Sequence, residues 1–516
     1  MMSLTHATVL QKLRRMVMLL FKRRINFRVT SMADIQDWVS PTGSPTHYQR
    51  PFDHLEKYEY YMSTMNPTIS QRAVVVGVTL SSSSPFSSLS LKAAWRSLRY
   101  AHPILGCKII PTGFDFHVKS STEIDEWVES TVKIIHPQES KEGEGEGEGE
   151  GGQGQESQKS IKLLSSNPPH PETAELYYSP STNELFIQIR HEIIDGIGSL
   201  MLLNNFLTSL FSPPTQSSTL TDSPSLLSPS TFKITGTQPA SPEIVQKNAS
   251  LVQAYFASPP ISLSSNPSPT LPYESHRYDY TFTSSQSSLL LKTCKSHEIT
   301  ITHAVTASTA FSILKLTNQT SGVFSTTLPI SLRDTLPAPY NTPVYAALFC
   351  ITTPLPVMPI TPETTLISLS KDVKKEFDDW KNDKDNIRYH EPQLQMFEEA
   401  VKAGLSPSNS AGKATVVVSS LGIVEKYLTV ASNHWGDDSN VQGGGGGESG
   451  GRVKDFWMGQ VQGNTKIIVF LYTFAGKIRL AACYNRRFHE DKDVQELIRV
   501  IVETLYEGLG IDGNTS

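Results

Sequence analysis

The residues of this sequence best suited to chemistry lie in the hexapeptide HEIIDG at positions 191–196. His191 follows a segment that alternates apolar and polar residues and precedes a leucine-rich segment with helical spacing, so we expect it at a strand end before a helix. The imidazole side chain is well matched to proton abstraction near neutral pH. The pattern therefore predicts that His191 is a general base. Asp195 either bonds the imidazole ring or anchors the loop.

Alternating strands and helices must position this motif. Apolar periodicity predicts strands at 71–80, 184–190, 343–353, 414–420, 465–473 and 476–484, and helices at 88–100, 197–211, 302–316 and 492–507. The pattern is typical of a mixed α/β protein with two halves. We expect an N-terminal lobe at 47–211, a Ser/Pro-rich crossover at 212–272 and a C-terminal lobe at 273–516.

Four polar segments interrupt these elements. Residues 138–160 are a Glu-Gly repeat, 212–243 and 257–272 are rich in Ser and Pro, and 436–451 are rich in Gly. Segments with so few apolar residues do not repay the entropy of ordering, so we expect linkers or surface insertions in a larger fold.

The N-terminal residues 1–33 carry seven basic residues and no acidic one: Lys12, Arg14, Arg15, Lys22, Arg23, Arg24 and Arg28. Such a segment is typical either of a mitochondrial transit peptide or of an upstream start before Met32. We favour the second interpretation and a cytoplasmic protein. Residues 1–46 are accordingly predicted to be a disordered tail and leader outside the fold.

Composition excludes several classes of protein. The net charge of −5 over 516 residues argues against a nucleic-acid partner. The four cysteines form no CxxC pair, which excludes a zinc ribbon and a disulfide framework and fits a reducing compartment. The sequence contains no run of 18 apolar residues, so we expect no transmembrane segment.

HEIIDG is one of five motifs that occur in a telling order. HxxxDG alone arises by chance in roughly a few per cent of chains of this length, so the order matters more than any single match. The other four are AHPILG at 101–106, LPISLR at 328–333, TVVVSSLG at 415–422 and DFWMG at 455–459. Together the set resembles the HxxxDG acyltransferase superfamily, which includes chloramphenicol acetyltransferase, plant BAHD enzymes, fungal alcohol and trichothecene acetyltransferases, and peptide-synthetase condensation domains. The resemblance spans about residues 47–508, and Trp457 and Met458 depart from the plant DFGWG pattern, which favours a fungal-type relative.

The resemblance implies two chloramphenicol-acetyltransferase-like lobes that enclose a central tunnel. Acyl-coenzyme A is then a co-substrate that is not tightly bound, and a small-molecule hydroxyl is the acceptor. His191 is the general base in mid-tunnel, no metal is required, and we expect a monomer. The residues that contact coenzyme A carry no sequence signature and are not assigned.

The resemblance also implies a strand entry at AHPILG, a strand that ends in Arg333 at LPISLR, and roles for other site residues. Spacing alone suggests that Asp195 orients the imidazole as a second catalytic residue, whereas the resemblance implies that it pairs with Arg333, and we favour this pairing. Ser419 and Ser420 are candidate oxyanion donors, although bonds to backbone would explain them equally well. Residues expected to support the site structurally are Gly196 and Arg333, together with Asp455 and Gly459 in a DFWMG loop.

Two other functions remain open. A condensation-type enzyme would use a carrier-protein thioester or an amine acceptor, but Arg190 stands where condensation domains have a first histidine. A non-catalytic small-molecule-binding protein on the same fold would not need His191, Asp195 and Gly196 together.

Overall fold

A computed structural model describes residues 37–41, 43–64, 72–82, 84–136, 165, 167–212, 221–265, 268, 270–271, 273–402, 412–432 and 452–512. The Glu-Gly repeat, the Gly-rich segment and the basic residues of the tail lie outside them. Part of the predicted leader was wrongly placed outside the fold, because Val39 forms a bridge with Gln49 and the Trp38 indole donates to the Ser228 carbonyl at 2.9 Å.

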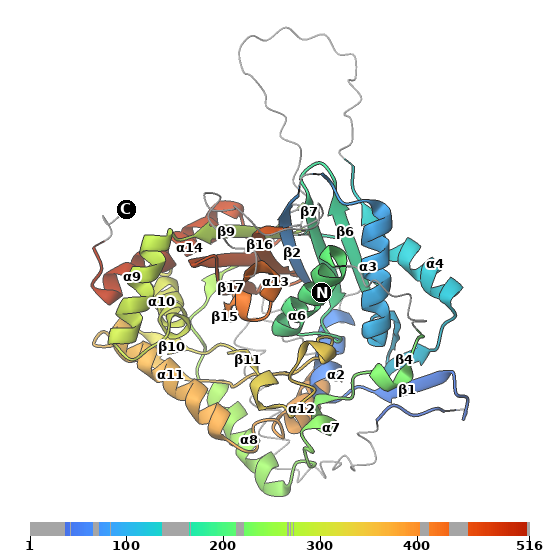
Figure 1. Cartoon of the computed structure of the whole chain (residues 1–516). Coiled ribbons are helices and arrows are strands. Elements are labelled where there is room, and N and C mark those ends of the chain that lie inside the picture. Colours follow the sequence, from blue (N-terminus) through green and yellow to red (C-terminus); the bar gives the residue numbers. More distant parts are fainter. Residues whose placement is uncertain are drawn as a thin grey trace.

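A five-stranded sheet forms the N-terminal lobe (Figure 1). Its strands, in pairing order, are β16 (Arg452–Gln460), β2 (Ala73–Ser81), β7 (Glu184–Arg190), β6 (Ala174–Ser179) and β5 (Val132–Ile134). Helices α3 (Ser88–Ala101) and α6 (Gly196–Phe211) pack together over one face. The period of two in β2 explains this, since Val74, Val76 and Val78 join the core that contains both helices.

A four-stranded sheet forms the second lobe. Its strands are β15 (Val416–Ile423), β17 (Ile467–Phe474), β18 (Lys477–Asn485) and β9 (Ser275–Thr281), and only the β15–β17 pair is parallel. Its core also contains helices α9 (Ser284–Ser296), α10 (Ile301–Leu316), α11 (Leu366–Asn382) and α14 (Asp491–Leu509). The mixed α/β architecture with two lobes is thus confirmed.

The DFWMG segment corrects one prediction, because it is not a loop. It lies in β16, a strand from the C-terminal half of the chain that pairs antiparallel with β2 in the sheet of the N-terminal lobe. Trp457 lies opposite Gly77, and a Cβ on Gly77 would stand 2.4 Å from the indole ring. Gly77 therefore makes the space that allows Trp457 to be fully buried, in a cluster with Val75, Tyr177 and Phe186.

The predicted crossover also differs from a surface insertion over much of its length. It contains α7 (Thr231–Ile234), α8 (Pro242–Tyr255) and the short strand β8 (Leu263–Ser264). The hydroxyls of Ser228 and Thr231 donate to the carbonyls of Ala347 and Phe349, at 2.7 and 2.6 Å. Asp222 forms a fully buried ion pair with Arg99 at 2.8 Å. Buried hydrogen bonds and an ion pair thus fix this segment to the rest of the fold, although its polar composition suggested a surface insertion.

Three predicted strands are shorter than expected or absent. Residues 343–353 contain a 3-10 turn at Pro343–Tyr345 and only the strand β12 (Ile351–Thr352). The LPISLR segment forms β11 (Ile330–Ser331), and Arg333 begins a 3-10 turn. AHPILG forms a 3-10 turn at Pro103–Gly106 and not a strand entry.

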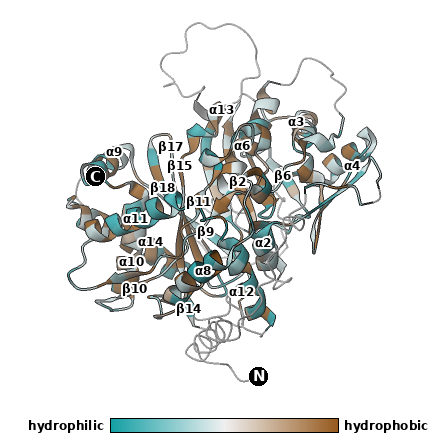
Figure 2. Cartoon of the chain, turned by 90° about the horizontal axis from the view of Figure 1, so that it is seen from below, coloured by the Kyte–Doolittle hydropathy of each residue, from teal (hydrophilic) through white to brown (hydrophobic). Residues whose placement is uncertain are grey.

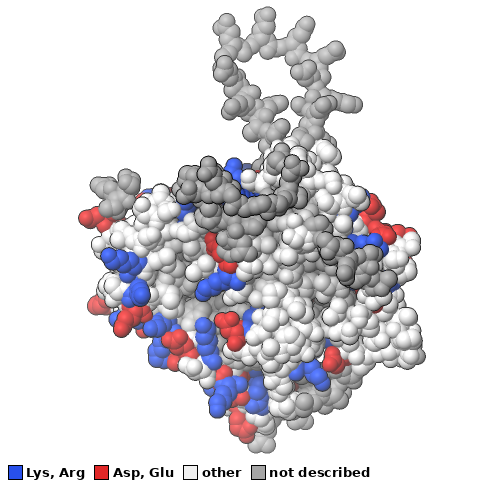
Figure 3. Space-filling model, viewed as in Figure 1, with Lys and Arg blue, Asp and Glu red and all other residues white. Residues whose placement is uncertain are grey.

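The remaining elements complete the periphery. They are β1 (His47–Pro51), α2 (His54–Thr64), β3 (Lys108–Ile110), β4 (Gly113–His117), α4 (Ser121–Thr131), β10 (Gly322–Phe324), β13 (Met358–Ile360), α12 (His390–Lys402), β14 (Lys413–Ala414) and α13 (Thr429–Ser432). Hydrophobic residues concentrate on the central strands, whereas outer helices such as α11 are largely hydrophilic (Figure 2). Lys/Arg and Asp/Glu side chains intermix on the face in Figure 3.

Helix length and hydropathy bear on a membrane location. Among the described residues, no single helix is long and apolar enough to cross a membrane. Helices α9 and α10 together pass the same test of length and composition, but the pair is bent by 94°.

Candidate active site

His191 lies at the C-terminal end of β7, in the turn that leads into α6. Its Nδ1 atom lies 2.9 Å from the carbonyl oxygen of Ile194. A carbonyl only accepts hydrogen bonds, so Nδ1 carries the proton and Nε2 keeps a free lone pair. The local turn therefore fixes the tautomer that a general base requires.

Two neighbouring contacts hold the ring and its loop. The Phe349 ring packs edge-on against the imidazole, with ring centroids 5.3 Å apart. The next residue, Glu192, is buried, forms an ion pair with Arg190 and accepts a hydrogen bond of 2.6 Å from Ser63. Burial alone would raise the pKa of Glu192, but the Arg190 charge and the hydrogen bonds from Arg190, Ser63 and the backbone together lower that pKa below its ordinary value. Arg190 thus has a structural partner beside the histidine.

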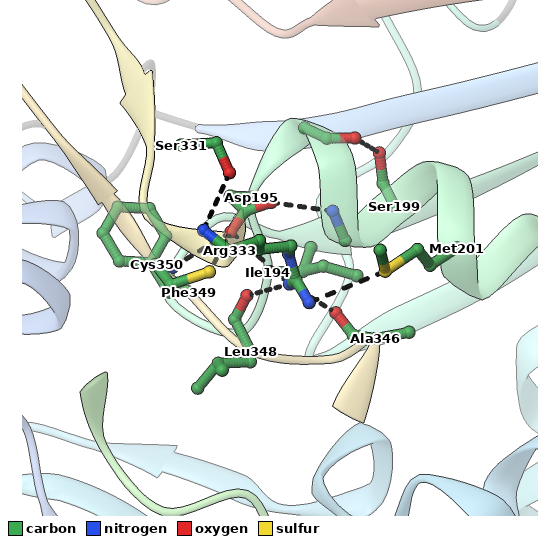
Figure 4. Close-up of polar contacts among 12 residues, drawn as sticks. Ile194, Asp195, Ser199, Met201, Ser331, Arg333, Ala346, Leu348, Phe349 and Cys350 are labelled. Carbon is green, nitrogen blue, oxygen red and sulfur yellow. Dashed lines mark hydrogen bonds and ion pairs between the residues drawn. The ribbon is translucent and has the colours of Figure 1, made fainter. Parts of the chain in front are cut away.

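Asp195 is fully buried, and the partners described for its two oxygens are Gly198, Arg333 and Cys350 (Figure 4). Oδ1 accepts from the Gly198 amide at 2.7 Å, which makes Asp195 the N-cap of α6. Oδ2 accepts from Arg333 Nη2 at 3.4 Å and from the Cys350 amide at 3.0 Å. The group that orients the imidazole is the Ile194 carbonyl, so the geometry does not support the orienting role that spacing alone suggested for Asp195.

Arg333 connects the histidine loop to the C-terminal half of the chain. Its guanidinium donates to the carbonyls of Tyr345, Ala346 and Leu348 at 3.1, 2.9 and 2.7 Å, in addition to Asp195 (Figure 4). Burial by itself lowers the pKa of this group, but the nearby Asp195 carboxylate raises it above its ordinary value. The buried Arg333 guanidinium thus fixes the backbone of residues 345–348 against the start of α6.

No sequence pattern identifies Cys350 as a site residue, since it lies 155 positions after Asp195. Its backbone amide and its thiol both donate to Asp195 Oδ2, the thiol at 3.1 Å. Burial, followed by the Asp195 charge, raises the pKa of the thiol well above its ordinary value. Cys350 is therefore a neutral donor that helps to satisfy a buried carboxylate.

Two glycines allow this close approach. A Cβ on Gly196 would stand 2.9 Å from Leu421 Cδ2, a side chain at the end of β15. A Cβ on Gly198 would stand 2.4 Å from both the Ala346 carbonyl oxygen and Arg333 Nη2. Gly196 was predicted from the motif. Gly198, the more restricted position of the two, was not.

Replacing Gly198 with alanine is expected to separate α6 from the 345–348 segment. A methyl group 2.4 Å from a carbonyl oxygen cannot be accommodated without backbone movement, and overpacking of this kind costs about 1–3 kcal/mol. Thermal melting should show the loss. Gly508→Ala is an unsuitable control, because its Cβ would stand 2.4 Å from Leu366. Gly236→Ser is a better control, because a Cβ there would have no neighbour within 4 Å. It should change the melting temperature only through the backbone strain of a non-glycine residue at φ +62°. Equal melting of Gly198→Ala and the unmodified protein would contradict the close packing.

The two candidate oxyanion serines lie on β15, where the pairing with β17 shifts register between Ser420 and Gly422. Both serines are partly exposed. Ser420 Oγ lies 2.8 Å from Thr302 Oγ1 at the start of α10. Because the adjacent Leu421 contacts the start of α6, the structure brings this end of β15 beside the histidine loop.

Asp455 and Gly459 belong to a different region of the molecule. Asp455 forms an ion pair of 2.5 Å with Arg479 of β18, and Gly459 lies opposite Val75 in the β16–β2 pairing. Both residues therefore join the strand that links the two sheets, and neither contacts the Asp195–Arg333 pair.

Solved structures with a similar architecture include an acetyltransferase and a condensation domain. The chain aligns with a trichothecene 15-O-acetyltransferase from Fusarium sporotrichioides with a TM-score of 0.71 and 15% identity, over 91% of this chain and 98% of that one. It also aligns with the first condensation domain of the calcium-dependent antibiotic synthetase with a TM-score of 0.58 and 12% identity, over 89% and 96%. The fold is thus the two-lobed chloramphenicol-acetyltransferase-like fold.

Curated relatives point to one branch of this class. The O-acetyltransferase pigM of Monascus ruber is 23% identical over 82% of this chain and 77% of its own length. The azaphilone biosynthesis cluster protein M of Aspergillus terreus is 24% identical over 66% and 80%. The acetyltransferase pigO of Monascus ruber is 22% identical over 91% and 97%. No protein-family model matches the sequence. The resemblance to acyltransferases is confirmed at the level of similarity, because two of these fungal relatives are named acetyltransferases and the third belongs to an azaphilone biosynthesis cluster.

Proposed function

We propose that this protein transfers an acyl group, in the first place acetyl, from acyl-coenzyme A to a hydroxyl of a specialised metabolite. The observation that carries the proposal is the bond of His191 Nδ1 to the Ile194 carbonyl, which leaves Nε2 free to accept a proton. The relatives, which include an O-acetyltransferase and a protein of azaphilone biosynthesis, support a hydroxyl acceptor of this kind.

His191 would act as a base and then as an acid. Nε2 takes the proton of the acceptor hydroxyl while its oxygen attacks the thioester carbonyl carbon between the two lobes. The tetrahedral intermediate then collapses, the carbon–sulfur bond breaks, and the imidazolium returns the proton to the departing thiolate. A positioned base of this type contributes about 10²–10⁴-fold to the rate.

The intermediate needs a hydrogen-bond donor for its oxyanion. Ser419 and Ser420 remain the candidates, because the register shift of β15 at Ser420 turns this strand end beside the histidine loop. Ser420 already has a hydroxyl partner in Thr302, which holds its oxygen in place. We favour Ser419 as the residue with the freer hydroxyl among those the structure describes here.

Arg190 argues against the condensation-type alternative. Its guanidinium is engaged by Glu192 and lies 3.2 Å from Ser63 Oγ, so it serves as an ion-pair partner beside the motif. The carrier-protein substrate and the amine acceptor therefore become the alternative arms of the test.

The test is the release of free thiol from a panel of acyl-coenzyme A donors of increasing chain length. Hydroxylated azaphilone and trichothecene acceptors are compared with amine analogues and with an acyl carrier-protein donor. We expect acceptor-dependent thiol release with acetyl-coenzyme A and a hydroxyl, with an acetyl ester as product. Turnover only with amines or only with the carrier protein would overturn the proposal.

A further inference from the structure

Three side chains on one face of the peripheral β1–β4 pair have the composition of a metal site. In the antiparallel register, His47 lies directly opposite His117, and Gln49 lies opposite Asp115. Successive side chains of a strand alternate between faces, so all four residues share one face. The ligand atoms of His47, Asp115 and His117 all lie within 4.8 Å of one another.

The two imidazoles converge on the carboxylate. His47 Nε2 lies 2.7 Å from Asp115 Oδ1, and His117 Nε2 lies 3.3 Å from Oδ2. The rings are stacked with centroids 4.2 Å apart and planes within 6°, and both Nε2 atoms lie beside the same carboxylate. The rings would have to tilt for both in-plane lone pairs to reach one ion. An ordinary histidine–carboxylate hydrogen bond involves one imidazole. Here each oxygen of the Asp115 carboxylate has its own imidazole neighbour.

These separations are close to those of a tetrahedral zinc site. With zinc–nitrogen and zinc–oxygen bonds of about 2.0–2.1 Å, tetrahedral angles place two ligand atoms about 3.3 Å apart. The separation between His117 Nε2 and Asp115 Oδ2 already has this value. His47 Nε2 lies 2.7 Å from the other oxygen, Oδ1, so this contact would have to widen and both carboxylate oxygens would have to face the ion. Gln49 Nε2 donates to Asp115 Oδ1 at 2.7 Å, which is the outer contact that orients a ligating carboxylate.

We propose that His47, Asp115 and His117 bind a divalent transition-metal ion, with Zn²⁺ as the ion that this set of two imidazoles and one carboxylate fits best. Imidazole nitrogen favours zinc, copper and nickel over the hard cations Mg²⁺ and Ca²⁺, which prefer all-oxygen sites. The His117 side chain is 58% exposed, so the site is open to solvent and water can complete the coordination.

The location separates this site from the proposed catalysis. β1 and β4 lie at the edge of the molecule away from α6 (Figure 1). An ion there would fasten β1 to β4, near the start of the described fold, without touching His191. Its sequence signal is weak, because His47 and Asp115 are 68 positions apart.

Calorimetric titration of Zn²⁺ into the tag-free, EDTA-treated full chain tests the proposal. We expect one equivalent to bind, Co²⁺ to give visible absorption bands at the same stoichiometry, and Mg²⁺ to give neither. Zn²⁺ should also raise the melting temperature, because an ion that binds only the folded chain stabilises it. His117→Ala and His47→Ala should abolish the stoichiometric binding. Gln49→Leu, which removes only the outer contact, should weaken it about 10–100-fold.

Two controls make the result decisive. His276→Ala removes an imidazole 3.3 Å from Glu274, a histidine–carboxylate contact with one imidazole, and should leave Zn²⁺ binding unchanged. Melting in EDTA shows whether each variant is folded. The proposal is overturned if the folded double variant His47→Ala/His117→Ala binds Zn²⁺ as the unmodified chain does, or if the unmodified chain gives no stoichiometric binding.

Discussion

Replacing His191 with alanine is expected to lower acyl transfer by at least about two orders of magnitude while the fold survives. Proton transfer by a positioned base contributes about 10²–10⁴-fold, which corresponds to about 3–5 kcal/mol of the barrier. The side chain contributes little to the fold by comparison, because it is partly exposed and bonds only to the local Ile194 carbonyl among the contacts described. The loss should therefore appear in the rate and not in the melting temperature.

The measurement is the turnover number for acceptor-dependent thiol release, with melting followed on the same samples. His276→Ala is the matched control, since it removes a partly exposed histidine from β9 of the other lobe. A His191→Ala protein that melts normally and keeps activity within about threefold would remove the histidine from the mechanism.

Local patterns were sufficient for much of the fold. The helix at 302–316 was found from its apolar spacing, and the structure begins it at Ile301, where Thr300 and His303 form a capping box. The strands predicted at 465–473 and 476–484 lie at Ile467–Phe474 and Lys477–Asn485, because their alternating and apolar runs report burial directly. Such signals lie within one segment of the chain.

Pairings between distant segments could not be obtained in this way. DFWMG became a strand because β2, hundreds of positions earlier, offers Gly77 as the space for Trp457. Residues 343–353 are apolar but mostly irregular, because the carbonyls of Ala346 and Leu348 bond to Arg333 and not to a neighbouring strand. The polar composition of 212–243 predicted a solvated segment and could not indicate that the buried Ser228 hydroxyl bonds to the Ala347 carbonyl.

The site shows the same division. The motif located His191, and the resemblance to known acyltransferases indicated that Asp195 pairs with Arg333; the ion pair is present at 3.4 Å. Cys350 and Gly198 were missed because their significance comes from atoms that reach the site from elsewhere in the chain. Their catalytic consequences remain predictions.

Replacing Asp195 with asparagine is expected to destabilise the protein and to lower activity only as a consequence. Removing one partner of a buried ion pair leaves the other charge uncompensated, which costs about 3–5 kcal/mol. Arg333 is buried and has no other carboxylate among its described contacts, so its charge would then rest on carbonyl oxygens alone. Arg333→Ala should have a similar effect. The double variant should cost less than the sum of the two, because the residues are coupled.

Thermal and denaturant unfolding measure these losses, and Asp455→Asn provides the matched control. Asp455 also pairs with an arginine, Arg479, but its side chain is 32% exposed, so the ion pair is worth only about 0–1 kcal/mol. Asp455→Asn should therefore lower the free energy of unfolding much less than Asp195→Asn does. An Asp195→Asn protein that unfolds normally but transfers acyl groups slowly would show that Asp195 acts on the imidazole, since its contacts to Arg333 and Cys350 would then contribute little to the fold. Because Oδ1 of asparagine can still cap α6, Asp195→Ala should cost about 1 kcal/mol more than Asp195→Asn, which separates the cap from the charge.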